Sequence, residues 1–290
     1  MRALIFGCGY LGKRLAREWV AEGYEVHATT RSPQRAADLV RAGVTAHVCD
    51  VIDPQSLGGL PEVDVVVWAV GLDRSANVPM RRVYVDGLSN ALAALPGEPR
   101  FVHVSSTSVY GQTDGGEVDE LAPTHPLEES GKVVLEAETL LRSRRPGAIV
   151  LRFAGIYGPD RLIRAKDLLA GRSLAIDPEK WLNLIHVEDG VRAVRAACQR
   201  GEPGTVYNVC NDRPARRREF YTLLAERIGA PPPRFVPPPP PLPDSERVNR
   251  RVVNRRLREG LGVTLAYPSF AEGLRACIPS ARKENEDLTT

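Results

Sequence analysis

The sequence predicts an α/β protein with a Rossmann-like, doubly wound parallel sheet of about seven strands and a small C-terminal lobe. Short apolar, β-branched runs alternate with segments whose apolar residues recur at helical spacing, such as 11–21 and 83–95. Near-continuous apolar strands are typical of a parallel sheet that helices cover on both faces. The runs that we interpret as strands are 3–6, 25–28, 46–49, 63–70, 100–105, 148–153 and 205–209.

The alternation becomes less regular after about residue 155, which sets the predicted domain organisation. The expected parts are a main domain at 1–155, rejoined by about 183–212, and a small lobe made of 156–182 and 213–278. Nine of the 24 prolines fall between Pro231 and Pro243, and such a run should be an extended connector on the surface. We expect a solvated helix face at 247–258 and a frayed tail at 279–290.

Composition excludes several classes of protein. Of the 290 residues, 43% are hydrophobic and 26% are charged, as in ordinary globular proteins, so a disordered or coiled-coil chain is excluded. A net charge of +3 is too small to suggest a nucleic-acid or membrane-surface partner. The five cysteines form no C-x-x-C pair and the five histidines have no metal-site spacing, so no metal is expected. Without a signal peptide or an apolar stretch of about 20 residues, a cytoplasmic location is expected.

A glycine-rich turn follows the first strand and opens a helix, with the sequence Gly7-Cys8-Gly9-Tyr10-Leu11-Gly12. In a G-x-G-x-x-G turn the first glycine permits a tight turn, the second lets a pyrophosphate approach the backbone, and the third lets helix and strand pack closely. The helix N-terminus then offers unpaired amides and partial positive charge to the phosphates. The strand–turn–helix context therefore predicts dinucleotide binding.

The end of the second strand predicts which dinucleotide is bound. Proteins that prefer NAD carry a carboxylate about 20 residues after the glycines, to bind the adenosine ribose. Here the strand ends in Thr30-Arg31-Ser32, where Arg31 could pair with a 2′-phosphate and Ser32 could add a hydroxyl donor. We therefore predict NADP. Asp50 and Val51, at the end of the third strand, are the candidates for contacting the adenine.

The chain also resembles the short-chain dehydrogenase/reductase superfamily, in its extended, epimerase/dehydratase-like branch. The resemblance extends from Gly7 to about Leu274 and depends on several landmarks in the right order. They are 7–12 (GCGYLG), 105–111 (SSTSVYG), 151–159 (LRFAGIYGP), 183–189 (NLIHVED), 206–209 (VYNV) and 261–262 (LG). The resemblance implies the Rossmann-like fold, a nicotinamide cofactor and a substrate cleft between the two parts of the chain.

The resemblance also implies particular site residues. It places the loop Ala69-Val70-Gly71 under the cofactor and gives Ser106, four residues before Tyr110, the role of polarising a substrate oxygen. Relatives then use a Y-x-x-x-K helix, whose lysine binds the nicotinamide ribose and lowers the pKa of the tyrosine. The matching lysine here is Lys132.

The tyrosine of that motif is absent, because Glu128 stands four residues before Lys132. A glutamate with a reference pKa of ~4.3 does not normally donate a proton at neutral pH. Three interpretations stay open: Glu128 is a general base, a displaced group such as Tyr157 replaces the tyrosine, or Glu128 is a solvated first-turn residue.

Two functions follow as alternatives. The first is an atypical NADP(H)-dependent oxidoreductase or epimerase-like enzyme that acts on a carbonyl or secondary alcohol; by resemblance, its small-molecule substrate could be a nucleotide sugar. The second is a non-catalytic NADP(H)-binding redox sensor or scaffold. Arg152 could meet a ligand or pair with an acid, whereas Asn183 and His186 border the substrate region in relatives. The lysine helix could also form a homodimer interface, and its Leu135, Leu140 and Leu141 could serve that interface or the core equally.

Overall fold

The computed structural model describes residues 1–278, so the expected tail at 279–290 lies outside the described residues. A seven-stranded sheet forms the centre of the N-terminal part, and every neighbouring pair of its strands is parallel. From one edge to the other the strands are β12 (Val206–Val209), β7 (Ile149–Phe153), β5 (Arg100–Ser106), β4 (Val65–Trp68), β1 (Arg2–Phe6), β2 (Glu25–Thr30) and β3 (Thr45–Val48). The predicted fold class is confirmed, and each of the seven predicted strands forms.

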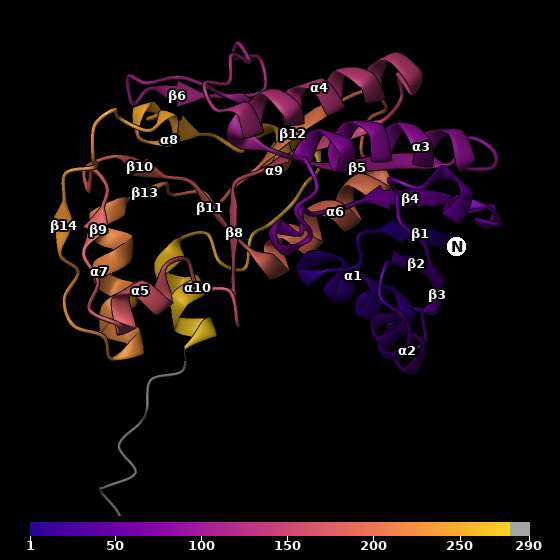
Figure 1. The fold of residues 1–290 in the computed structure, drawn as a ribbon, viewed down its shortest axis with the longest axis horizontal. Helices are drawn as coiled ribbons and strands as arrows, with labels where there is room; N and C mark the ends of the chain where they lie inside the picture. The colour runs from indigo at the N-terminus through magenta and orange to yellow at the C-terminus, as the bar shows by residue number, and fades with distance from the viewer. Residues whose placement is uncertain (279–290) are drawn as a thin grey trace, which may run out of the picture.

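Helices cover both faces of this sheet (Figure 1). One face carries α1 (Tyr10–Ala21), α2 (Pro33–Arg41) and α6 (Val187–Arg200). The other carries η1 (Pro54–Leu57), η3 (Arg82–Asp86), α3 (Gly87–Ala94) and α4 (Glu129–Arg144). The helix predicted over 83–95 forms, but its first part, η3, is a π-helix. A π-helical turn of this kind shifts the helical phase and is frequent at functional sites.

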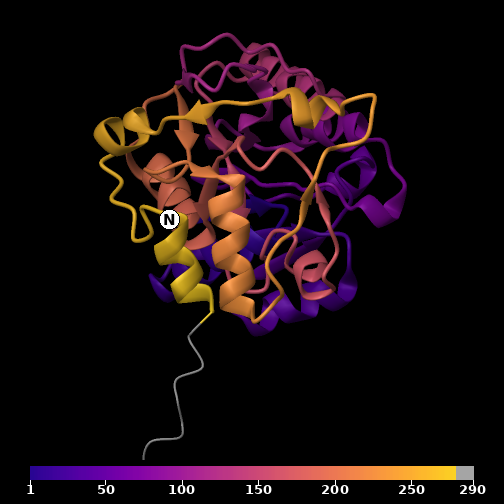
Figure 2. The ribbon, with the colours of Figure 1, turned by 90° about the vertical axis from the view of Figure 1, so that its left-hand side faces the viewer.

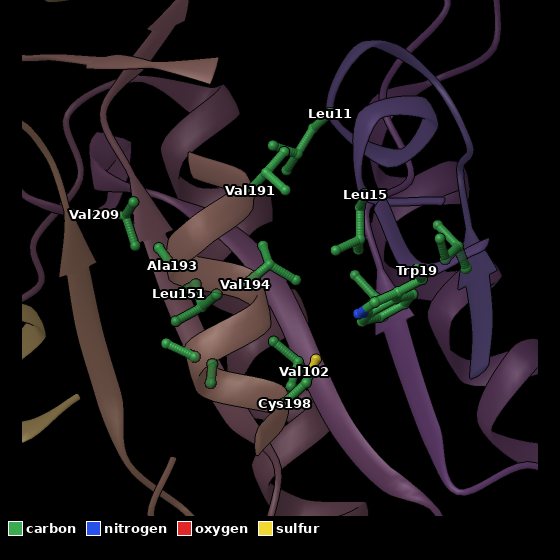
Figure 3. Close-up of a cluster of buried hydrophobic side chains, with 14 of the residues drawn as sticks. Leu11, Leu15, Trp19, Val102, Leu151, Val191, Ala193, Val194, Cys198 and Val209 are labelled. Carbon is green, nitrogen blue, oxygen red and sulfur yellow. The ribbon is translucent and has the colours of Figure 1, made fainter. Parts of the chain in front are cut away.

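The core under α1 and α6 is the larger of the two layers of apolar side chains. Leu15 and Trp19 of α1 face Val191 and Val194 of α6 above the sheet (Figure 3). All four side chains are at most 1% exposed. This packing fixes α1, and with it the glycine-rich turn at its start, against the carboxyl ends of the strands.

The later segments build a smaller lobe with its own core. Its elements are β8 (Gly155–Tyr157), α5 (Ala165–Leu169), β9 (Leu174–Ala175), β10 (Trp181–Leu182), β13 (Ala215–Arg216), α7 (Arg217–Ile228), β14 (Phe235–Val236) and α10 (Phe270–Cys277). In Figure 2, α7 and α10 lie side by side on this lobe. Their contact encloses an apolar cluster that includes Tyr157, Phe220 and Leu274.

Short elements connect the lobe to the main sheet. They are η2 (Arg74–Ala76), η4 (Thr107–Val109), β6 (Glu117–Val118), β11 (Leu184–His186), α8 (Asp244–Arg247), β15 (Arg251–Val252) and α9 (Arg255–Gly260). The expected helix over 247–258 is interrupted, because β15 pairs with β6 and buries Val252, and its last residues are helical, in α9. The residues 237–241 of the proline run lie mostly exposed on the lobe.

Candidate functional site

A cavity of about 790 Å³ lies at the carboxyl ends of β1, β2, β4 and β5. Open α/β sheets bind their ligands at this end of the strands. Eleven of the predicted cofactor residues line it, namely Gly7, Gly9, Tyr10, Leu11, Gly12, Arg31, Asp50, Val51, Ala69, Val70 and Gly71. The two exceptions among the predicted cofactor residues are Ser32 and Lys132.

The three glycines of the turn are required for different reasons. Gly7 has a φ of +80°, and a Cβ there would lie 2.5 Å from the carbonyl oxygen of Ala69. A Cβ at Gly12 would lie 2.9 Å from the carbonyl oxygen of Gly7, so helix and strand could not approach each other. At Gly9 the nearest neighbouring atom would be 4.0 Å away, and this residue lines the cavity. Protein packing therefore explains Gly7 and Gly12, whereas the open space above Gly9 fits a phosphate-bearing ligand close to the backbone.

The adenosine end of the cavity is basic. Arg31 and Arg35 both line it, and the side chain of Arg31 pairs with Asp73 at 2.9 Å. Hydrogen bonds from Ser75 and then from Arg31 lower the pKa of Asp73, so this carboxylate is charged. Ser32 caps α2 instead of lining the cavity, because its Oγ accepts a hydrogen bond from the backbone N–H of Arg35.

Ser106 lies on the cavity wall at the end of β5. Its Oγ accepts a hydrogen bond from the backbone N–H of Ser108 at 3.1 Å, which leaves the hydroxyl proton available for a ligand. The neighbouring Ser105 hydroxyl donates to Glu138 at 2.5 Å. The structure therefore brings Ser106 to the position that the resemblance implies, beside residues of the glycine-rich turn.

Below Ser105 a buried ion pair ties α4 to the sheet. Arg152 of β7 is 2.8 Å from Glu138, and the two residues are 4% and 1% exposed. Burial alone would lower the pKa of Arg152, but the hydrogen bonds and charge of Glu138 outweigh it and raise that pKa. Arg152 also donates to the hydroxyl of Tyr110, which donates in turn to Asn208. Of the two predicted roles for Arg152, the structure shows the ion pair.

Lys132 is not brought to the cavity. It lies exposed on α4, where its Nζ pairs with Glu129 at 2.5 Å. The helix turns Val134 and Ala137 towards the cavity instead, because Gly131 packs against η4 so closely that a Cβ there would lie 2.4 Å from the carbonyl oxygen of Ser108. This contact sets the rotation of α4, so the predicted contact of Lys132 with the ribose does not fit the structure.

Glu128 and Tyr157 are also absent from the cavity wall. Glu128 is the residue before α4, and its charge acts on Arg250, whose guanidinium donates to the carbonyl oxygen of Thr107. Tyr157 is fully buried in the lobe core, packed edge-on against His186 and Phe220, and burial raises its pKa. Neither side chain is placed to exchange a proton with a ligand in this cavity.

Asn183 and His186 hold the backbone where the lobe meets the sheet. The amide of Asn183 bonds the backbone of Arg250 and Val252, and the Nδ1 of His186 accepts from the N–H of Glu188 at the start of α6.

The cavity contains further side chains that the sequence analysis did not single out, among them Arg35, Tyr84, His103 and Arg161. Tyr84 comes from the π-helix η3, and its hydroxyl accepts a hydrogen bond from the backbone N–H of Leu72 at 3.2 Å. Its proton is therefore free to be donated. The sequence contains no signal for this placement, because helical periodicity does not reveal a π-helical turn.

Two further findings concern metals and membranes. Within residues 1–278, no group of three or more His, Cys, Asp or Glu side chains is arranged to hold a metal ion. In the same part of the chain, no helix combines the length and the apolar character needed to span a membrane.

The sheet order, the glycine-rich turn and the cavity together define a dinucleotide-binding protein of the Rossmann type. The model of the NAD dependent epimerase/dehydratase family matches residues 3–210, well over half of the chain. The chain belongs to this family. It therefore belongs to a family of enzymes that depend on a nicotinamide dinucleotide, and the predicted superfamily is confirmed.

Three relatives illustrate this membership. Protein YeeZ of Escherichia coli (strain K12) is 33% identical over 245 residues, which cover 81% of this chain and 86% of YeeZ. A 4-hydroxy-2-methyl-3-oxo-4-farnesyl-3,4-dihydroquinoline-1-oxide ketoreductase of Stigmatella aurantiaca is 29% identical, over 77% of this chain and 72% of that protein. The structure of a conserved protein of unknown function from Silicibacter pomeroyi superposes with a TM-score of 0.77 at 30% identity, covering 95% of this chain and 97% of that one.

Proposed function

We propose that this protein is an NADP(H)-dependent reductase of a small-molecule carbonyl, or of the matching secondary alcohol in the reverse direction. The observation that carries the choice of cofactor is the pair of arginines, Arg31 and Arg35, on the wall at the end of β2. The acid near them, Asp73, comes from another loop and already pairs with Arg31. Both side chains of that pair are 45% exposed, so it contributes little and a 2′-phosphate could replace the carboxylate.

The residues of the cavity have separable roles in this proposal. The dinucleotide supplies or accepts the hydride when bound, and the turn 7–12 with Ala69, Val70 and Gly71 would hold it. Ser106 would donate a hydrogen bond from its hydroxyl to the substrate oxygen and so polarise the carbonyl. Tyr84 lies on the wall, and its hydroxyl proton has no acceptor among residues 1–278, so we assign it the proton that the alcohol product gains. A ketoreductase among the relatives supports a carbonyl substrate.

The cofactor assignment is tested by binding. We expect Arg31→Ala to weaken NADPH binding by roughly 10-fold or more while NADH binding changes little, because a charge-assisted bond to the 2′-phosphate is lost. Arg41→Ala is the matched control, since Arg41 is the last residue of the nearby helix α2, is exposed and does not line the cavity. Equal losses for NADPH and NADH, or no loss, would refute the NADP assignment.

A non-catalytic NADP(H) sensor is the second candidate, and one observation favours it. The helix that carries tyrosine and lysine in relatives presents the apolar Val134 and Ala137 to the cavity here. Turnover separates the two functions. If the protein is an enzyme, it consumes NADPH with at least one member of a panel of ketones and keto sugars, including nucleotide sugars. Ser106→Ala should then reduce the rate of NADPH consumption. The sensor binds NADPH but transfers no hydride to any of them.

Two expectations complete the proposal. We keep the cytoplasmic location as part of it. We also propose a homodimer formed through the outer face of α4, where Leu135, Leu140 and Lys132 line a groove with Arg81.

A further inference from the structure

Two arginines contact the ring of Tyr10, the fourth residue of the glycine-rich turn. The guanidinium carbon of Arg14 lies 4.2 Å from the centre of the Tyr10 ring, and that of Arg161 lies 5.3 Å from it. The Tyr10 hydroxyl donates to the carbonyl oxygen of Pro159 at 2.7 Å. A turn of the C-terminal lobe is thereby attached to the start of α1, about 150 residues away in the sequence.

The turn that carries Arg161 has a well-defined shape. Gly158 and Arg161 exchange backbone hydrogen bonds at 3.3 and 3.0 Å, and Asp160 between them has a left-handed φ of +64°. A Cβ at Gly158 would lie 2.6 Å from the Tyr10 hydroxyl and 2.7 Å from a methyl group of Val187. Because this site admits only glycine, the turn can lie directly on the phosphate loop, and it places Arg161 on the cavity wall.

The two arginines differ in charge balance. Arg14 pairs with Glu188 at 3.0 Å and donates to the backbone oxygen of Tyr10. Arg161 is exposed, and its guanidinium has no carboxylate within ion-pair distance among residues 1–278. The other cations on the wall, Arg31 and Arg35, lie at the adenosine end. Arg161 is therefore the cation of the cavity nearest to the glycine-rich turn whose charge is not already neutralised.

A pyrophosphate carries two negative charges at neutral pH, whereas a helix N-terminus offers roughly half a positive charge. We propose that Arg161 binds the pyrophosphate of the dinucleotide and so closes the C-terminal lobe over the phosphate loop, an inference that builds on the proposed function. A planar guanidinium can donate two parallel bonds to phosphate oxygens and still stack on Tyr10. The cofactor would then be held by side chains of both lobes.

Three ligands separate this role from that of Arg31. NADPH contains both the pyrophosphate and the 2′-phosphate, ADP-ribose contains only the pyrophosphate, and adenosine 2′-monophosphate contains only the 2′-phosphate. By calorimetry, we expect Arg161→Ala to weaken the binding of NADPH and of ADP-ribose roughly 10-fold and to leave the affinity for adenosine 2′-monophosphate unchanged. Arg31→Ala should weaken the binding of NADPH and of adenosine 2′-monophosphate but not that of ADP-ribose.

The controls make the outcome unambiguous. Arg172→Ala removes an exposed arginine of the same lobe, paired with Asp167 and away from the cavity, and should change none of the three affinities. Arg161→Lys should recover part of the loss, because the charge remains without the bidentate geometry. An ADP-ribose affinity within twofold of wild type in Arg161→Ala would overturn this inference alone. A wild-type protein that binds neither NADPH nor ADP-ribose would overturn the proposed function as well.

Discussion

Lowering the pH from 7 to 5 should destabilise the protein through His103, which lies in β5 on the cavity wall. Its side chain is 4% exposed, and its Nδ1 is buried with no hydrogen-bond partner in the described part of the chain. Burial lowers the pKa of His103 to about 4, although the nearby charge of Glu138 acts in the opposite direction. The folded protein therefore holds this imidazole neutral, whereas the unfolded chain protonates it with a pKa of about 6.5.

Proton linkage gives the sign and the size of this change in the free energy of unfolding. A histidine whose pKa is lowered on folding contributes its full stability above pH 6.5, and this contribution is lost as the pH falls from 6.5 towards 4. Between pH 7 and pH 5 the unfolded state gains about 2 kcal/mol relative to the folded state from His103 alone. His186 is 2% exposed and burial also lowers its pKa to about 4, so it should add a loss of similar size.

Urea unfolding followed by tryptophan fluorescence measures this directly. The wild-type free energy of unfolding should fall between pH 7 and pH 5, and the fall should be about 2 kcal/mol smaller in His103→Gln, which cannot be protonated. His125→Gln is the control, because the imidazole of His125 is exposed. The reasoning is refuted if His103→Gln loses as much stability as wild type over the same pH step.

Two further pairs of substitutions test the site. Gly7→Ala should destabilise the fold by about 1–3 kcal/mol, because it combines a left-handed φ with a clash, whereas Gly9→Ala should leave the thermal midpoint nearly unchanged and weaken NADPH binding several-fold. Equal destabilisation by both would show that packing, and not the ligand, requires Gly9. Glu138→Gln leaves the buried Arg152 without its counter-charge and should cost about 3–5 kcal/mol in urea unfolding, while the exposed Glu136→Gln should cost little. A small effect at Glu138 would mean that water or another group compensates Arg152.

The cavity connects these predictions with function. His103, Ser106 and the glycine-rich turn line one cavity, and Ser105 on the same wall donates to Glu138 of the buried Glu138–Arg152 pair. A substitution that breaks this pair should therefore change cofactor binding as well as stability. Measuring the NADPH affinity of each variant beside its unfolding free energy separates the two effects.

Local sequence determined the sheet and the phosphate loop. The central strands, such as β1, β4 and β7, are short apolar runs, and burial on both faces leaves few other arrangements for such runs. The glycine spacing specified the turn, because its φ and its close contacts are set within a few residues of the chain. Arg31 could be assigned to the cavity for the same reason, since it directly follows β2.

The rotation of α4 was decided by tertiary packing. The match of Lys132 to a family motif suggested a side chain in the site, but motif spacing does not state which face of a helix is buried. Gly131 fits against Ser108 and turns the helix, so Lys132 faces solvent. The apolar spacing of Val134, Ala137 and Leu141 was the sequence signal that could have indicated the buried face.

Tyr157 and Arg161, only four residues apart, show what sequence alone cannot determine. The tyrosine is buried between α7 and α10, whereas the arginine reaches the cavity through a contact with Tyr10. Both outcomes depend on elements far away in the sequence that pack against this segment only in the folded chain. The sequence by itself therefore determined the fold, the phosphate loop and the place of Arg31 after β2, because these depend on local patterns. The tertiary structure decided which polar side chains face the cavity, because that depends on helix rotation and on contacts between the two lobes.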